Sequence, residues 1–449
     1  IVKMDKTTGE IVASGTMITT SAFNITPPTY ADGKIFVALA GSRVQAFDAE
    51  TLESLWVFKS TTNGQPNSPI TYHDGYVYTG FWSGETKDCD YVCLSVEDED
   101  PDNPTEAKDA TWQYMRKGGF YWAGCYVTDN YLLVGTDDGV SGYTAQTSQL
   151  LSLDPLTGSV IDSLDGLNAD IRSSISRDES TGAFYFTSKG GSFYEVYVND
   201  DGTIEQDSLR TLDLGGMSTS TPVVYNGRAY VGVSGDSQFG AYSGHNITVI
   251  DLDSFEIAYT CPTQGYPQTS GLLTTAYEDE DDYCYIYFFD NYTPGKLRVI
   301  KDRPGQTSID DDDTLLYAPV LFTPSGAQSQ YALCSPIVDE DGTIYFKNDS
   351  AHMMAVGSKI TSIEVTSQPD KLTYKEGDLF DSEGMKVVAH YANGLTKDVT
   401  NYISYPKDFL TTEDKDITIS YPHVLYGDTD DGDNTNDWNN INVTADAPT

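Results

Sequence analysis

Residues 44–56 read VQAFDAETLESLW, in which a short apolar run, a turn led by an Asp and a second apolar run follow one another. Three other segments repeat this phrase: IVKMDKTTGEIV (1–12), LLSLDPLTGSVI (150–161) and ITVIDLDSFEIAY (247–259). Asp suits the turn because its carboxylate accepts hydrogen bonds from backbone N–H groups two residues further on. Each copy therefore predicts two strands joined by an Asp turn.

A second phrase, a short turn followed by alternating strand-forming residues, occurs in seven copies. They begin at Asp32, Asp74, Asp129, Thr181, Asn226, Asp282 and Asp341. A third strand lies ahead of each copy, and alignment without gaps places Thr26, Ser68, Ala123, Ser173, Thr221, Ser270 and Ser335 at its equivalent position. These positions are 42 to 65 residues apart. Repeats of about this size with three or four strands each are typical of a β-propeller, whose blades bury their faces against one another. We therefore expect an all-β fold with a seven-bladed propeller.

The ends of the repeat region predict how the ring closes. Residues 332–357 supply three strands, and residues 1–17 supply the phrase that normally ends a blade. The N-terminal strand is therefore expected to complete the seventh blade and to remove a sheet edge. Because residues 1–5 and 352–356 compete for the third-strand position, an eight-bladed propeller is the alternative.

These phrases resemble the quinoprotein-type repeat, also called PQQ-like, with its signature Ala-x-Asp-x-x-Thr-Gly-x-x-x-Trp. Ala46, Asp48 and Trp56 fit it, and residues 154–158 keep the Asp and the Thr-Gly step. The resemblance spans residues 1–357 and implies a propeller. Some members of this family bind pyrroloquinoline quinone and calcium and oxidise alcohols or sugars. Others, similar to the outer-membrane assembly lipoprotein, are enzymatically silent scaffolds.

Residues 358–449 resemble a bacterial immunoglobulin-like module of group 3, a small β-sandwich. The resemblance rests on strand-length alternations, a turn at Gly384, and Asn393-Gly394, a strong hairpin signal because both residues tolerate positive φ. Such modules serve as spacers or adhesive stalks on bacterial surface proteins. The resemblance therefore implies a place outside the cell, and residues 440–449 are expected to lead into further surface domains.

The charge balance excludes several partners. The chain has 26 Lys and Arg against 68 Asp and Glu, a net charge of −42. Nucleic acids and anionic membrane surfaces would be repelled by such a protein. No apolar run is long enough for a transmembrane helix, so no membrane insertion is expected. The chain begins at Ile1, which suggests that a targeting segment has been removed.

Familiar catalytic patterns are missing from the sequence. It has no Gly-x-Ser-x-Gly elbow, no phosphate-binding Gly loop, no His-Glu-x-x-His motif and no adjacent cysteine pair. The six cysteines are expected to be buried thiols, and the acidic runs at 97–100, 278–282, 310–313 and 428–433 to be solvated loops rather than calcium sites. We therefore predict no catalytic residues, no metal and no cofactor, although spacing alone does not exclude a glycosidase-like carboxylate pair.

One end of the propeller channel is the predicted binding surface. The residue before each aligned Ser or Thr should ring its opening, which gives Ile25, Asn67, Trp122, Arg172, Ser220, Thr269 and Cys334. Trp122 with Phe120 and Tyr121 would form an aromatic platform for a sugar or peptide, and Arg172 would supply a cation. The predicted ligand-binding residues are Trp122, Arg172, Asn67, Tyr121, Phe120 and Thr269. The alternative is that the same side chains plug the channel.

These observations favour an exported, non-enzymatic recognition or adhesion module at the cell surface, which binds an extracellular glycan or protein. Loops at residues 85–110 and 301–330 would diversify its binding face. The alternatives are an enzyme, either a quinoprotein dehydrogenase or a glycan-degrading propeller, and an envelope-assembly scaffold that pairs with peptide strands through a sheet edge.

Overall fold

A computed structural model describes residues 1–6, 8–19, 26–142, 145–235, 244–275, 282–310, 313–358, 360–392, 394–424 and 438–446. The predicted all-β class is confirmed: this part of the chain contains strands and only three short 3₁₀ helices, Gln206–Ser208, Gly326–Gln328 and Thr400–Tyr402. None of its helices is long and apolar enough to cross a membrane. The chain divides into two compact units. Unit 1 comprises Ile1–Met4, Ile11–Phe322 and Gln330–Pro336, and unit 2 comprises Asp5–Glu10, Thr323–Ser329 and Ile337–Thr449.

Unit 1 is a succession of sheets in which neighbouring strands are antiparallel and follow one another along the chain, except for β10 (Glu106–Lys108), a fifth strand of the first sheet. The first has β3 (Thr29–Ala31), β4 (Lys34–Leu39), β5 (Arg43–Asp48) and β6 (Ser54–Lys59), and the second has β7 (Thr71–His73), β8 (Tyr76–Gly80), β9 (Asp88–Ser95) and β11 (Trp112–Lys117). The third has β12 (Tyr126–Val127), β13 (Leu132–Gly135), β14 (Ser148–Leu153) and β15 (Val160–Leu167). The fourth has β16 (Ser176–Arg177), β17 (Phe184–Thr187), β18 (Ser192–Val196) and β19 (Arg210–Asp213). The fifth has β20 (Val223–Tyr225), β21 (Arg228–Val233), β22 (Asn246–Asp251) and β23 (Glu256–Pro262). The last has β24 (Leu272–Thr274), β25 (Cys284–Phe289), β26 (Leu297–Asp302) and β27 (Val320–Phe322).

Two kinds of turn build each sheet, as the repeated phrases predict. Asp32 and Gly33, like the equivalent pair at residues 74–75, both have positive φ, which gives the tight turn between the first two strands. In the turn between the last two strands, the Asp48 carboxylate accepts hydrogen bonds from the N–H groups of Glu50 (2.9 Å) and Thr51 (2.8 Å). These hydrogen bonds stabilise the ionised carboxylate and lower the pKa of Asp48.

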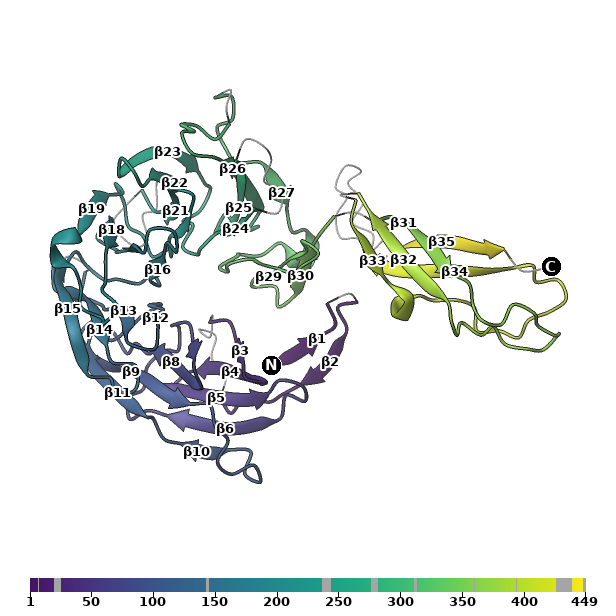
Figure 1. The fold of residues 1–449 in the computed structure, drawn as a ribbon, viewed down its shortest axis with the longest axis horizontal. Coiled ribbons are helices and arrows are strands. Elements are labelled where there is room, and N and C mark those ends of the chain that lie inside the picture. Colours follow the sequence, from purple (N-terminus) through teal and green to yellow (C-terminus); the bar gives the residue numbers. More distant parts are fainter. Residues whose placement is uncertain are drawn as a thin grey trace. The chain divides into compact units, whose positions relative to one another are not determined.

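Hydroxyl groups at the aligned positions (Thr26 and Ser68), or one residue before them (Ser220 and Thr269), join successive sheets. Their side chains donate to the backbone carbonyl of the next repeat: Thr26 to Pro66 (2.5 Å), Ser68 to Phe120 (2.9 Å), Ser220 to Thr269 (3.1 Å) and Thr269 to Cys334 (3.0 Å). The first strands of neighbouring sheets also contact each other, as β3 does with β7 and β7 with β12. Figure 1 shows the sheets of unit 1 following one another around a common centre, with these first strands innermost.

The predicted closure by the N-terminal strand is not formed among the described residues. β1 (Val2–Met4) pairs with β2 (Ile11–Ser14), and neither pairs with another described strand. A local turn explains this hairpin, because the Asp5 carboxylate accepts the N–H of Thr8 (2.8 Å). Ile1 packs against the first sheet, in the cluster formed by Val37, Leu39 and Phe47.

The predicted variable loop at residues 85–110 contains two strands. Its first half is β9, a central strand that carries the buried thiols of Cys89 and Cys93. Its second half contains β10 (Glu106–Lys108), which crosses to the first sheet and pairs in parallel with the outer edge of β6. β9 is buried on both faces from Cys89 to Leu94, so it lacks the alternation of apolar and polar residues that marks a half-buried strand in a sequence. The second predicted loop, residues 301–330, contains β27.

Unit 2 contains a three-stranded sheet and the C-terminal tail. The sheet is β28 (Ile337–Val338), β29 (Ile344–Lys347) and β30 (Met353–Val356). The tail has β31 (Ile360–Ser367), β32 (Lys386–Tyr391) and β33 (Thr396–Asp398) in one sheet and β34 (Asp416–Val424) and β35 (Trp438–Asp446) in another. Its core includes Ile363, Val387 and Ile419. Asn393 and the acidic run at 428–433 lie outside the described residues. The seven-blade count, the immunoglobulin-like assignment and the boundary at 357/358 stay predictions.

Candidate binding site

One end of the sheets of unit 1 collects the chemically distinctive side chains. The first two strands of each sheet are antiparallel, so the residues before the first strand and those after the second lie at the same end. We call this the inner-strand end. It contains Asn67 before β7, Tyr121 and Trp122 before β12, and Asp170 and Arg172 before β16. From the second strands it receives Trp82 and Glu85 after β8, Asp137 after β13, Lys189 after β17 and Asn291 after β25.

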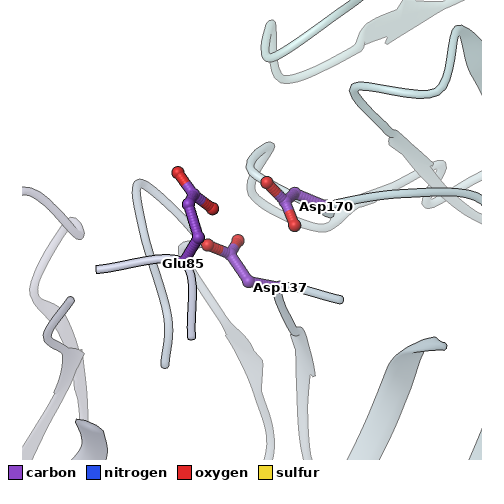
Figure 2. Close-up of side chains that lie close together, drawn as sticks. All are labelled: Glu85, Asp137 and Asp170. Atoms are coloured by element: carbon purple, nitrogen blue, oxygen red, sulfur yellow. The ribbon is translucent and has the colours of Figure 1, made fainter. Parts of the chain in front are cut away.

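Arg172 is the centre of a buried charge network. Only 3% of its side chain is exposed, and its Nη2 lies 2.7 Å from Asp137 Oδ2, 2.8 Å from Asp170 Oδ2 and 2.8 Å from Glu85 Oε2. Its Nε donates a second hydrogen bond to Asp137 (3.1 Å). Three connections of the chain supply the carboxylates, which converge in Figure 2. These ion pairs therefore connect three consecutive repeats at the inner-strand end.

Three aromatic rings form a continuous stack beside this network. Tyr121 lies between Trp82 (ring centroids 4.5 Å apart, planes 24° apart) and Trp122 (4.6 Å, 21°). The guanidinium carbon of Arg172 is 4.7 Å from the centroid of the Tyr121 ring. Asn67 donates a hydrogen bond to the Tyr121 hydroxyl (3.2 Å). All three rings are partly exposed, so they combine a fixed geometry with access to solvent.

Several polar atoms at this end have no hydrogen-bond partner within the described part of the chain. They are Asn67 Oδ1, Trp82 Nε1, Trp122 Nε1, Ser188 Oγ, Asp290 Oδ1 and both side-chain polar atoms of Asn291. Asn67 and Asn291 are nine-tenths or more buried. Buried polar groups are normally paired, because each unpaired group loses its hydration without compensation. These donors and acceptors are therefore available to a bound molecule or to ordered water.

Burial shifts the titration of the charge network. Burial raises the pKa of Asp137 well above its usual range and that of Asp170 to about 6, although Arg172 opposes both shifts. For Lys189, burial and then the charge of Arg172 lower the pKa to about 7. The ionised forms of Asp170 and Lys189 are thus both disfavoured by the folded state.

The shift at Asp170 predicts a pH dependence of stability. A carboxyl group whose pKa is raised on folding binds a proton more tightly in the folded state, so its contribution to stability is lost as the pH rises from about 4 to about 6. We expect Asp170→Asn to become more stable relative to the wild type over this interval, as measured by urea unfolding at several pH values. Asp48→Asn is the control, because a lowered pKa affects stability only below about pH 4. A constant difference between Asp170→Asn and the wild type would contradict the prediction.

The carboxylates of Glu85, Asp137 and Asp170 have oxygens within 4.8 Å of one another, a donor set of the kind that binds calcium. Arg172 Nη2, however, is within hydrogen-bond distance of all three. The guanidinium therefore already supplies the positive charge that a cation would bring. The three carboxylates also repel an anionic quinone, so these residues do not fit the calcium and quinone of the quinoprotein enzymes.

The structure brings some of the predicted site residues together and separates others. Tyr121, Trp122, Asn67 and Arg172 lie in one site, but Arg172 is neutralised by carboxylates and is not the exposed cation that the sequence suggested. Phe120 is fully buried in the core, 5.0 Å from the Tyr91 ring. Thr269 donates its hydroxyl proton to a backbone carbonyl of the next repeat. Ile25 lies outside the described residues.

Sequence reasoning missed Trp82, Glu85, Asp137, Asp170 and Lys189. Three of them, Trp82, Asp137 and Lys189, occupy the same position, the second residue after the second strand of a sheet. The seven aligned phrases contain this signal. Extending the alignment past the second strand would have placed these side chains beside Arg172.

A family model and several solved structures are similar to this chain. Residues 1–88 match the family model described as "Outer membrane protein assembly factor BamB". No curated protein matches the chain. Among solved structures, the C-terminal WD40 domain of Sif2 has a TM-score of 0.51 at 11% identity and covers 77% of this chain and 84% of its own.

Two further solved structures are similar at lower scores. BamB from Moraxella catarrhalis has a TM-score of 0.43 at 11% identity, with 87% of this chain and 95% of that chain covered. The computationally designed Ika8 protein has 0.45 at 13%, with 83% and 94% covered. The repeated four-stranded sheets, the match over residues 1–88 and the WD40 neighbour together support a β-propeller with PQQ-like repeats.

Proposed function

We propose that this chain is a non-catalytic recognition protein that binds an uncharged glycan at the inner-strand end of its propeller. The observation that carries the proposal is the stack of Trp82, Tyr121 and Trp122 beside polar atoms without partners. Aromatic faces pack against the C–H faces of sugar rings, and neighbouring donors and acceptors can bind their hydroxyl groups. Trp122 also has a φ of +62°, an unfavourable conformation for a bulky residue that is often retained where it orients a functional side chain.

The charges at the site favour an uncharged ligand. The positive charge of Arg172 is already balanced by the three carboxylates that surround it, so it does not favour an anionic group on a ligand. A free sulfate or carboxylate on the ligand would approach Glu85, which remains partly exposed, against the negative field of the whole protein. A neutral sugar is repelled neither by Glu85 nor by the net negative charge of the protein.

The same geometry argues against glycan cleavage. A retaining glycosidase needs two carboxyl groups about 5 Å apart on either side of the scissile bond. Asp137 and Asp170 are close, but both side chains are fully buried and both are bound to Arg172. A sugar ring has no access to them, which supports binding without catalysis.

The proposed location is the bacterial envelope or cell surface. It is supported by the match of residues 1–88 to a family model described for an outer-membrane assembly factor. In this proposal the tail, with its sheets of three and two strands, is an immunoglobulin-like spacer. The family match also favours a second candidate function, that of an envelope-assembly scaffold with a protein partner.

Removing one ring tests the proposed site. We expect Trp122→Ala to weaken binding of the full chain to a neutral oligosaccharide at least tenfold, about 1.4 kcal/mol, as measured by isothermal titration calorimetry. Tyr30→Ala is the matched control, because Tyr30 is 69% exposed and lies on β3, outside the stack. Unchanged affinity in Trp122→Ala, with circular dichroism showing an intact fold, would place the ligand elsewhere.

A further inference from the structure

The outer edge of the last sheet of unit 1 is unusually apolar. The segment at residues 315–322 ends in β27, which pairs with β26 on one side and with no described strand on the other. Five large apolar side chains are exposed in this short stretch: Leu315 (41%), Leu316 (77%), Tyr317 (54%), Val320 (43%) and Leu321 (48%). Contiguous apolar exposure of this kind marks a surface that another molecule covers.

The first sheet shows what can cover such an edge in this fold. β10 adds to the outer edge of β6 as a parallel strand, with Glu106, Ala107 and Lys108 opposite Trp56, Val57 and Phe58. The chain itself therefore provides an example of strand addition at an outer edge. β27 is the fourth strand of its own sheet, as β6 is of the first, and no described strand lies beyond it (Figure 1).

Charge restricts the partner. Asp310 lies five residues before Leu315, and its carboxylate accepts hydrogen bonds from the N–H groups of Thr314 (2.9 Å) and Leu315 (3.3 Å). Asp313 lies between Asp310 and Leu315 in the chain. These acids belong to the run at 310–313, in a chain of net charge −42. A second copy of this chain would be repelled, whereas a basic segment would be attracted.

We propose that the edge of β27 binds an extended segment of a partner protein, which adds as a further strand, places apolar side chains on Leu316 and Leu321, and carries Lys or Arg toward Asp310 and Asp313. Backbone hydrogen bonds of the added strand provide affinity, and the apolar and acidic side chains provide selectivity. This surface is separate from the inner-strand end and does not depend on the proposed glycan site.

The test uses the full chain and fluorescent peptides of alternating valine and threonine flanked by lysines. We expect the lysine peptide to bind at least tenfold more tightly than the same peptide flanked by glutamates. The variant carrying Leu316→Ser and Leu321→Ser should lose at least tenfold in affinity for the lysine peptide. Val160→Ser is the control, because Val160 is 49% exposed on the outer strand β15.

Three results would overturn the proposal. They are equal binding of the two peptides, no binding of the lysine peptide, and unchanged binding in the double variant. Binding to phosphatidylcholine vesicles is measured in parallel. If the chain bound the vesicles and not the lysine peptide, and the double variant lost vesicle binding, the surface would be assigned to a membrane instead. Because both leucines are exposed, the double variant should keep the circular dichroism spectrum of the wild type.

Discussion

Arg172→Met is expected to destabilise unit 1 by about 3–5 kcal/mol at pH 7, the usual cost of removing one partner from a buried ionic network. The substitution leaves the carboxylates of Asp137 and Asp170 buried and that of Glu85 beside them without their shared counterion. It should also raise the pKa of Asp137 and Asp170 further, because Arg172 now lowers both. The loss of stability should therefore shrink as the pH falls from 7 toward 5. Urea unfolding of the full chain, followed by circular dichroism, measures both effects.

An exposed ion pair provides the control for Arg172→Met. Lys371 and Asp378 lie 3.1 Å apart with much of both side chains exposed, and pairs of this kind contribute about 1 kcal/mol or less. Lys371→Met should therefore have little effect at either pH. If Arg172→Met were as mild as Lys371→Met, the buried network would not hold the repeats together as the structure indicates.

Trp56→Ala is expected to cost about 3–5 kcal/mol, as large aromatic truncations in a core usually do. The side chain is fully buried, with its ring 5.8 Å from that of Phe36, and it belongs to the cluster that joins the first sheet to Val92 and Leu94 of the second. The ammonium of Lys108 lies 5.7 Å from the Trp56 ring centroid. The variant should therefore weaken packing between two sheets and the attachment of β10. Urea unfolding measures the change in free energy, and hydrogen exchange at residues 106–108 reports on β10.

The control for Trp56→Ala is an aromatic residue outside the core. Tyr30→Ala removes a ring that is 69% exposed and should change the free energy of unfolding by less than about 1 kcal/mol. Equal effects of the two substitutions would show that the signature Trp does not bridge the sheets.

Much of the propeller could be predicted because its signals are local and repeated. Asp48 and the Asp-Gly turn at residues 32–33 determine hairpins within a few residues of themselves, and the same phrases recur through the chain. β10 could not be foreseen, because its pairing with β6 is non-local and its sequence resembles a polar loop. The N-terminal segment was correctly predicted to form two strands, but the prediction that it completes the seventh blade was wrong. Pairing between strands distant in the sequence leaves no local pattern.

The site shows the same division. Asn67, Trp122 and Arg172 could be found because each precedes the first strand of its sheet at the same offset, and Tyr121 adjoins Trp122. The burial of Arg172 among carboxylates was not predicted, because Asp137 and Glu85 lie 35 and 87 residues away in the sequence and the alignment was not extended past the second strands. Phe120 shows a further limit: adjacent aromatic residues in a turn point to different environments, and this one enters the core.

The central claim is that Arg172 is neutralised within the protein, so that the inner-strand end binds uncharged sugars through its aromatic stack. The most direct measurement is a glycan array probed with the full chain, in which neutral oligosaccharides are printed beside sulfated forms of the same sugars. We predict binding to a neutral glycan and at least tenfold weaker binding to its sulfated form. Preference for the sulfated forms, or binding to none of the neutral glycans, would contradict the account.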